Sequence, residues 1–158
     1  MNHELQTKIA NMTSEELYAA VYTDPLTGAL NRRAWEELGY KARRVVLIDL
    51  DSLKFINDNI GYRAGDKYLV ALVEVLQSRF SDRVYRLAGD EFLVVADTLA
   101  ELIDGVGEAQ AEYPVFSWGV GSTLDEADKA LKAHKAAREA TGERAGRGER
   151  PAWVRGVA

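Results

Sequence analysis

The spacing of hydrophobic residues changes several times along the chain, and each change predicts a new element. Residues 43–51 contain a continuous apolar run that ends in acidic residues, as in a buried strand. Residues 82–97 have the pattern of two strands joined by a short turn, which predicts a hairpin. Residues 65–80 predict a helix, because apolar side chains recur there at helical spacing: Leu69, Leu72, Val73, Leu76 and Phe80.

Capping and helix-breaking residues place further elements around these. Thr13 followed by Glu16 forms the pattern of a capping box, so residues 13–21 predict a helix. Pro25 and Gly28 then end it. The same reasoning predicts helices over residues 31–38, 98–113 and 123–140 and a strand over residues 114–121. Strands that alternate with helices and include one hairpin indicate a single α/β domain with a mixed β-sheet.

The composition of the 158 residues excludes several kinds of chemistry. The absence of cysteine excludes disulfides, thiol catalysis and zinc–thiolate sites, and two histidines are too few for a histidine-based metal site. No apolar run approaches the roughly 18 residues that span a membrane, and the first residues lack the apolar core of a secretory signal. We therefore expect a cytoplasmic protein with no membrane partner.

The net charge of −5 is unevenly distributed. Residues 1–128 hold 12 Lys and Arg against 22 Asp and Glu, whereas residues 129–158 hold 8 against 3. A basic end on an acidic body is compatible with contact to phosphates or nucleic acid. It is equally compatible with a solvated helix followed by a flexible tail.

The acidic residues of the predicted hairpin are the main candidates for chemistry. Asp90 and Glu91 are adjacent at the turn, where like charges repel, and Asp49 ends the preceding apolar strand. Carboxylates brought together in this way are stabilised by a hard cation such as Mg²⁺, which prefers oxygen ligands. A solubilising turn is the alternative, since acidic pairs at strand ends are common.

Five separated stretches of the sequence resemble the GGDEF family of diguanylate cyclases, in the order in which that family has them. They are DPLTGALNRR (residues 24–33), DLDSLKFINDNIGYRAGD (49–66), RLAGDEF (86–92), FSWGVG (116–121) and EADKALKAHKAA (126–137). The resemblance implies a palm-like α/β fold, in which helices surround a central mixed β-sheet that carries the signature hairpin. It divides the chain into an N-terminal helical segment (1–22), a compact GGDEF domain (23–140) and a flexible basic tail (141–158).

The resemblance also implies an activity, in which two GTP condense into cyclic di-GMP and pyrophosphate is released. Because one domain holds one GTP, two domains would meet in a transient homodimer. Three alternatives stay open from the residues. The chain could be a degenerate module that binds GTP or cyclic di-GMP without turnover, or a related nucleotide cyclase with another product. The third alternative is a palm scaffold whose basic tail contacts nucleic acid. We expect no nucleic-acid partner.

Individual roles follow position by position from the resemblance. Asp49, the backbone carbonyl of Leu50 and Asp90 would hold Mg²⁺ or Mn²⁺, and Glu91 would be the second catalytic acid, which binds metal or activates the attacking 3′-hydroxyl. The remaining roles are guanine binding (Asn57, Asp66), phosphate binding (Lys54, Lys135) and an inhibitory product site of the form RxxD (Arg79, Asp82). Turn caps, solvated lysines and a local ion pair at a helix end are the structural alternatives for these six residues.

The chain departs from the family pattern at several positions. Ala88 replaces the first glycine of the signature, which would be strained if the turn requires a positive φ. Tyr62 stands where the family usually has histidine. The expected arginine four residues after Lys135 is Glu139, and Arg138 lies one position early. We expect His134 to be a surface histidine.

The N-terminal helical segment carries apolar residues that could serve in dimerisation, namely Leu5, Ile9 and Leu17. Packing of this segment against its own domain is the alternative, and it is the one that we expect.

Overall fold

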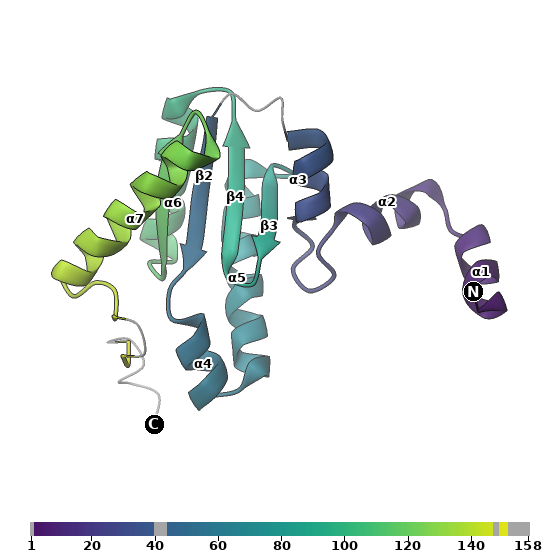
Figure 1. Ribbon diagram of the computed structural model, residues 1–158, viewed down its shortest axis with the longest axis horizontal. Helices are drawn as coiled ribbons and strands as arrows, with labels where there is room; N and C mark the ends of the chain where they lie inside the picture. The colour runs from purple at the N-terminus through teal and green to yellow at the C-terminus, as the bar shows by residue number, and fades with distance from the viewer. Residues whose placement is uncertain (1, 40–43, 147–148, 152–158) are drawn as a thin grey trace.

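The computed structural model describes residues 2–39, 44–146 and 149–151, and Figure 1 shows their arrangement. The helices are α1 (His3–Ala10), α2 (Ser14–Tyr22), α3 (Arg32–Leu38), α4 (Leu53–Asn59), α5 (Tyr62–Phe80), α6 (Leu99–Glu112) and α7 (Leu124–Ala140). The strands are β1 (Leu30–Asn31), β2 (Arg44–Leu50), β3 (Val84–Ala88), β4 (Glu91–Ala96) and β5 (Phe116–Gly121). No helix in this described part is long and apolar enough to cross a membrane.

The five strands form one mixed sheet in the order β1-β3-β4-β2-β5. β1 pairs with β3 in parallel, and the other neighbouring pairs are antiparallel. The predicted hairpin is the β3–β4 pair. The strand that ends at Asp49 and Leu50 lies between β4 and β5, so the acidic strand end is in the middle of the sheet.

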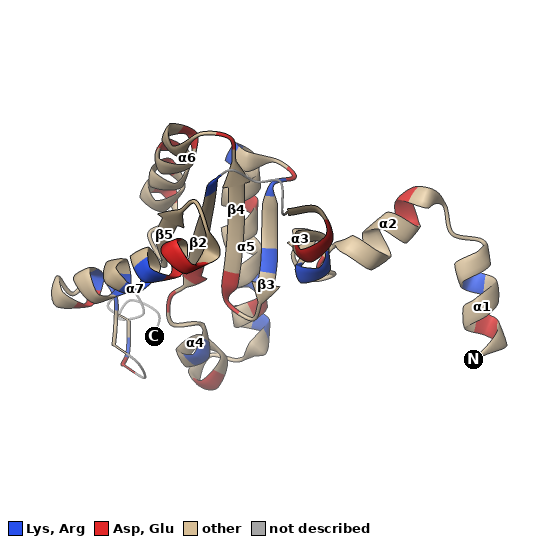
Figure 2. Cartoon of the chain, turned by 45° about the horizontal axis from the view of Figure 1, so that its top comes forward, with Lys and Arg blue, Asp and Glu red and all other residues tan. Residues whose placement is uncertain are grey.

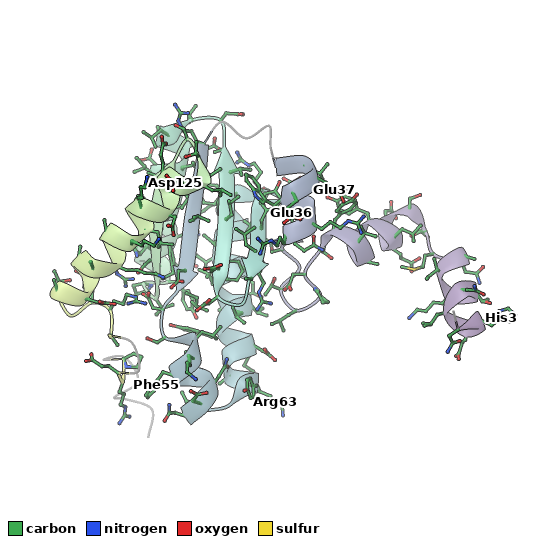
Figure 3. All side chains as sticks on the ribbon, in the orientation of Figure 1. His3, Glu36, Glu37, Phe55, Arg63 and Asp125 are labelled. Carbon is green, nitrogen blue, oxygen red and sulfur yellow. The ribbon has the colours of Figure 1, made fainter. Side chains whose placement is uncertain are left out.

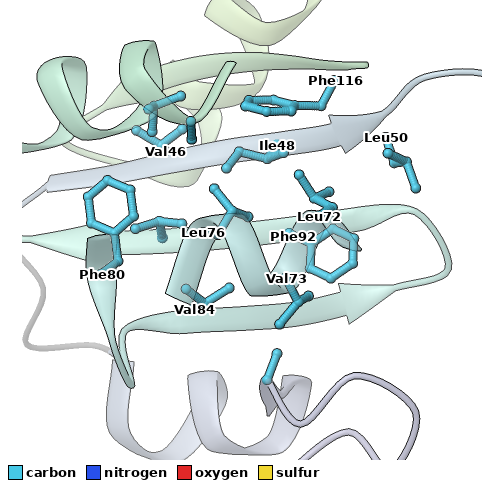
Figure 4. Close-up of a cluster of buried hydrophobic side chains, with 14 of the residues drawn as sticks. Val46, Ile48, Leu50, Leu72, Val73, Leu76, Phe80, Val84, Phe92 and Phe116 are labelled. Carbon is cyan, nitrogen blue, oxygen red and sulfur yellow. The ribbon is translucent and has the colours of Figure 1, made fainter. Parts of the chain in front are cut away.

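Helices cover both faces of the sheet. One face carries the larger core, part of which Figure 4 shows. α5 contributes Leu72, Leu76 and Phe80 to this core, and α6 contributes Val106. The other face is covered by α3 and α7 around a smaller cluster that includes Leu93. Side chains alternate along β2, so Val46, Ile48 and Leu50 enter the larger core. Asp49 therefore faces the side that α7 covers.

A close approach between β5 and α7 holds this second layer in place. A Cβ atom at Gly119 would lie 2.0 Å from the backbone nitrogen of Leu131 in α7, so only glycine permits the contact. The approach lays α7 across β5 and the neighbouring β2. Lys135 and Arg138 of α7 are thereby placed beside Asp49 and Asp51 at the acidic end of the sheet.

The N-terminal helices extend away from the sheet (Figure 1). Neither α1 nor α2 has a buried residue, and the side chains of Leu5 and Ile9 are 54% and 51% exposed. The expectation that this segment packs against its own domain is therefore wrong for α1. The end of α2 does contact the domain, because the hydroxyl of Tyr22 donates to Glu37 Oε2 at 2.6 Å and Asn31 Nδ2 donates to the carbonyl of Val21 at 2.8 Å.

The chain after α7 differs in part from the flexible tail that was expected. Arg144 packs back onto the domain, where its Nε lies 2.8 Å from Asp51 Oδ1, and Pro151 is buried. The expectation for Arg147 and for residues 152–158 lies outside the described residues. The described part of this segment therefore borders the end of the sheet at which Asp49 lies.

Candidate functional site

The acids predicted for metal binding meet where β2 ends and β4 begins. Asp49 lies directly opposite Glu91 in the antiparallel register, so their side chains share one face of the sheet with Cβ atoms roughly 5 Å apart. Asp90 occupies the turn, and its backbone carbonyl accepts a 2.9 Å hydrogen bond from the Leu50 amide. The hairpin turn is therefore fastened to the end of β2, which keeps the three acids together.

Asp49 is the most buried member of this acidic cluster, at 8% exposed. Lys135 of α7 places its Nζ 2.7 Å from Asp49 Oδ2. Burial raises the pKa of the Asp49 carboxyl, Lys135 partly offsets this, and the charge of Asp90 adds to the rise. The influence of Asp90 indicates that the two carboxylates lie close enough to repel, which is the condition that a bound cation relieves.

The donor set fits a hard divalent cation that is held mainly by substrate. Within the described residues no group of three or more His, Asp or Glu is arranged to hold a metal ion. Mg²⁺ is nevertheless commonly bound by one or two carboxylates, with water and substrate phosphates completing its shell. Asp49 and Asp90 supply two such carboxylates, so they suit an ion that arrives with a nucleotide.

A cavity of about 570 Å³ opens beside Asp49, between α4, α7 and the chain that follows α7. Its wall carries three basic side chains: Lys54, Lys135 and Arg144. Figure 2 shows basic and acidic positions together where α7 crosses the end of β2. Lys54 is 86% exposed and pairs with Asp58 at 2.7 Å. Four carboxylates share this lining, from Asp49, Asp58, Glu139 and Glu149, so the cavity offers basic groups for phosphates beside acidic groups for a cation.

The two residues expected to bind guanine, Asn57 and Asp66, lie on the adjoining helices α4 and α5, outside the lining of this cavity. A Cβ atom at Gly65 would lie 1.9 Å from Asn57 Oδ1, so the amide of Asn57 rests against the first turn of α5. Asp66 follows Gly65 in that turn and is exposed. Figure 3 labels Phe55 on α4 and Arg63 on α5, which mark these adjoining elements.

Residues 24–33, the first stretch that resembles the family, hold the hairpin in place and do not line the cavity. Arg86 donates to Asp24 Oδ2 at 3.0 Å and, from Nη2, to the carbonyl of Gly89 at 2.8 Å. Burial alone would raise the pKa of Asp24, but hydrogen bonds from Thr27 and Arg86 lower it overall. Ala88 does not have a positive φ, so the alanine in the signature adds no backbone strain.

The residues of the expected product site lie at the opposite end of the sheet from the hairpin turn. Arg79, near the end of α5, places Nη2 2.8 Å from Glu112 Oε2 of α6, and its Nε lies 3.7 Å from Glu108. Asp82 is exposed in the connection to β3. The structure therefore engages Arg79 with α6 and does not pair it with Asp82.

A buried ionic network beside the site was not predicted from the sequence. Arg138 is 5% exposed and donates to the carboxylate of Asp51, to Ser117 Oγ at 2.9 Å and to the carbonyl of Phe116 at 2.6 Å. Asp51 is 4% exposed and also accepts from Ser117 Oγ at 3.0 Å. Because Arg138 points into this network, it cannot replace the arginine that is missing at position 139.

His134 is also more involved than a surface histidine, which corrects the expectation for it. Its Nδ1 accepts the backbone N–H of Trp118 at 3.0 Å, and its ring meets the Trp118 ring edge-on. Burial and the nearby charge of Arg138 lower the pKa of His134. The neutral ring therefore acts as a structural link between α7 and β5.

Comparisons with known proteins show which family the chain resembles. Residues 21–112 match the family described as diguanylate cyclase, GGDEF domain. Diguanylate cyclase DgcP of Escherichia coli (strain K12) is 34% identical over 148 residues, which cover 74% of this chain and 43% of that protein. Cyclic di-GMP phosphodiesterase NbdA of Pseudomonas aeruginosa is 43% identical over 86 residues, which cover 47% of this chain and 11% of that protein.

A solved structure that comprises only the GGDEF domain of a Pseudomonas aeruginosa protein superposes on the chain with a TM-score of 0.64. The two are 25% identical, and the match covers 73% of this chain and 90% of that one. The chain spans less than half the length of the two curated relatives. The family match extends over more than half of the chain, which confirms the resemblance and the mixed α/β fold: the chain belongs to the GGDEF domain family.

Proposed function

We propose that the chain condenses two GTP into cyclic di-GMP and releases pyrophosphate. The observation that carries the proposal is the meeting of Asp49, Asp90 and Glu91 where β2 ends and β4 begins, with Asp49 in the wall of a cavity that also carries Lys54, Lys135 and Arg144. In each step a 3′-hydroxyl oxygen forms a bond to the α-phosphorus of the other GTP. The bond from that phosphorus to the bridging oxygen breaks, and pyrophosphate leaves with its electron pair.

The residues of the chain take separate parts in this reaction. Asp49, Asp90 and the carbonyl of Leu50 would hold a divalent ion, Mg²⁺ or Mn²⁺, which supplies positive charge against the reacting phosphate. Glu91 is exposed at the start of β4, where its carboxylate could accept the proton of a 3′-hydroxyl. Lys54 and Lys135 would bind the triphosphate. The proposal places the reaction in the cytoplasm.

A second copy of the chain is part of the proposal, since each domain offers one such cavity. Two cavities that face one another would bring each 3′-hydroxyl to the other α-phosphate. The exposed apolar side chains of α1, Leu5 and Ile9, offer a contact between copies. The homodimer would be transient, because α1 is short and only one of its faces is apolar.

Recognition of guanine is assigned to Asn57 and Asp66, and Gly65 provides a test. Gly65→Ala would place a Cβ on Asn57 Oδ1, so the amide must move. We expect GTP to bind about tenfold more weakly, because a hydrogen bond to the base is lost, with a change in unfolding free energy within about 1 kcal/mol. Equilibrium binding and urea unfolding measure the two quantities.

Gly107→Ala is the matched control for this variant. It makes the same change inside α6, where a Cβ would meet nothing within 4 Å. Equal GTP affinity in the two variants would remove Asn57 from the guanine site.

We also propose that Arg79 and Asp82 form an inhibitory site that binds the product, cyclic di-GMP. An arginine fork suits a phosphodiester, and Arg79, whose side chain is 20% exposed, lies three residues before exposed Asp82. Binding there would compete with the ion pair to Glu112. The site of Arg79 and Asp82 lies at the other end of the sheet from the acidic cluster, so product could bind there without occupying the catalytic cavity.

A second function is favoured by one feature of the cavity. Glu139 contributes a carboxylate to the wall where the family pattern has arginine, which weakens attraction for a triphosphate. A module that binds GTP or cyclic di-GMP without turnover would tolerate this change. Chromatography after incubation with GTP and Mg²⁺ separates the two functions, because only the enzyme yields cyclic di-GMP.

A further inference from the structure

Arg144 reaches the cavity from outside every motif that resembles the family. α7 ends at Ala140, Gly142 turns the chain with a φ of 75°, and the backbone N–H of Arg144 bonds to the carbonyl of Arg138 at 3.1 Å. This turn directs the Arg144 side chain back toward the sheet, where it is 16% exposed. Arg144 therefore lines the same cavity as Asp49 and Lys135.

The guanidinium of Arg144 is held on one side by a fixed anchor. Its Nε donates to Asp51 Oδ1 at 2.8 Å, and Asp51 is itself fixed by Arg138 and Ser117. Its Nη1 donates to Glu139. Among the described residues the second terminal nitrogen, Nη2, makes no hydrogen bond. An arginine fixed through Nε can direct its remaining donors at a ligand without losing side-chain freedom on binding.

The position of Arg144 also matters electrostatically. Its guanidinium and the Asp49 carboxylate line the same cavity. Lys135 lies on the Asp49 carboxylate from the other side. A phosphate that entered beside Asp49 would thus meet an ammonium and a guanidinium from two different segments.

We propose that Arg144 is a substrate-binding residue that contacts the phosphates of the nucleotide, with Asp51 as its anchor and Glu139 as a competing counterion. The proposal rests on the proposed function, and it adds the chain after α7 to the substrate site. Planar guanidinium groups bind phosphate oxygens in a forked geometry that lysine cannot reproduce. The anion at position 139 is then compensated by a cation five residues later.

Binding measurements on the full chain separate this role from a structural one. The probes are the non-hydrolysable nucleotide α,β-methylene-GTP with Mg²⁺, inorganic tripolyphosphate and guanosine. Arg144→Gln should weaken binding of the analogue and of tripolyphosphate about tenfold and leave guanosine binding unchanged. Arg32→Gln is the matched control, because Arg32 is 67% exposed on α3 and pairs only with Glu36 among the contacts described.

Glu139→Gln should change the affinity for the nucleotide analogue in the opposite direction. Asp51 still anchors Arg144 in this variant, while a negative charge leaves the cavity, so the analogue should bind several-fold more tightly. If Arg144 only clamps the chain to α7, both Arg144→Gln and Glu139→Gln would weaken binding, and that result would overturn the proposal. Unchanged affinity in Arg144→Gln would overturn it as well. If either result is found while the wild-type protein binds the analogue, the proposed function still stands. If the wild-type protein does not bind the analogue, the proposed function itself is overturned.

Discussion

Replacing Asp90 with asparagine should lower the rate of cyclic di-GMP formation about 10³-fold and leave the fold intact. Asp90 lies in the hairpin turn, where its backbone carbonyl, and not its side chain, accepts the bond from Leu50. The substitution therefore removes a charge without breaking the link that fastens the turn. The lost carboxylate is one of the two that would hold the divalent ion against the reacting phosphate. Initial rates from chromatography measure the loss.

Asp104→Asn provides the control for this variant, since Asp104 is exposed on α6 and belongs to no proposed site. It should retain wild-type activity. Circular dichroism and the urea midpoint should agree among wild type and both variants. An Asp90→Asn protein that makes product at the wild-type rate would contradict the assignment of the acidic cluster.

Arg138→Met should destabilise the domain by about 3–5 kcal/mol, the largest stability effect that we expect for a single substitution. The methionine fills a similar volume but donates to none of the acceptors that Arg138 serves. Asp51 would keep only Arg144 and Ser117 as partners, and the carbonyls of Phe116 and Pro114 would lose a buried donor. Urea unfolding monitored by tryptophan fluorescence gives the free energy.

Arg32→Met is the comparison for Arg138→Met. It removes an exposed pair between Arg32 and Glu36, and such pairs contribute about 0.5 kcal/mol or less. A loss of similar size in the two variants would show that the buried network contributes little. A cycle with Asp51→Asn then measures the coupling between Asp51 and Arg138 directly.

The elements that sequence could predict are those whose pattern is local. The stripe from Leu69 to Phe80 gives α5, the apolar run before Asp49 gives β2, and Thr13 with Glu16 forms the expected capping box. The short helix α4 was not predicted, because residues 53–59 show no periodicity long enough to detect. α1 was expected to pack on the domain, yet a single apolar face does not say which partner covers it.

The same distinction applies to the site. The proximity of Asp49 to the acids of the hairpin was predicted because two adjoining strands bring their ends together, and in the observed register Asp49 lies opposite Glu91. The part of these acids in metal binding stays a prediction. The pairing of Asp51 with Arg138 and Arg144 was missed, since the residues are 87 and 93 positions apart. Chain folding alone brings such groups together, and no spacing rule indicates it.

The involvement of Arg144 shows why the tail was misjudged from composition. Glycine and arginine between residues 142 and 150 are typical of a flexible segment. Composition does not show, however, that a buried carboxylate from another part of the chain pairs with an arginine of this segment. Asp51 supplies that partner from the end of β2.

The most direct test of the account is the specific rate of cyclic di-GMP formation from GTP and Mg²⁺, measured over a wide range of protein concentrations. A catalytic unit made of two copies that meet transiently predicts that product forms and that its rate per mole of protein rises with concentration before it levels off. Product at a constant specific rate would contradict the transient pairing of sites. No product at any concentration, with Mn²⁺ tested as well, would contradict the proposed synthesis and favour a module that only binds nucleotide.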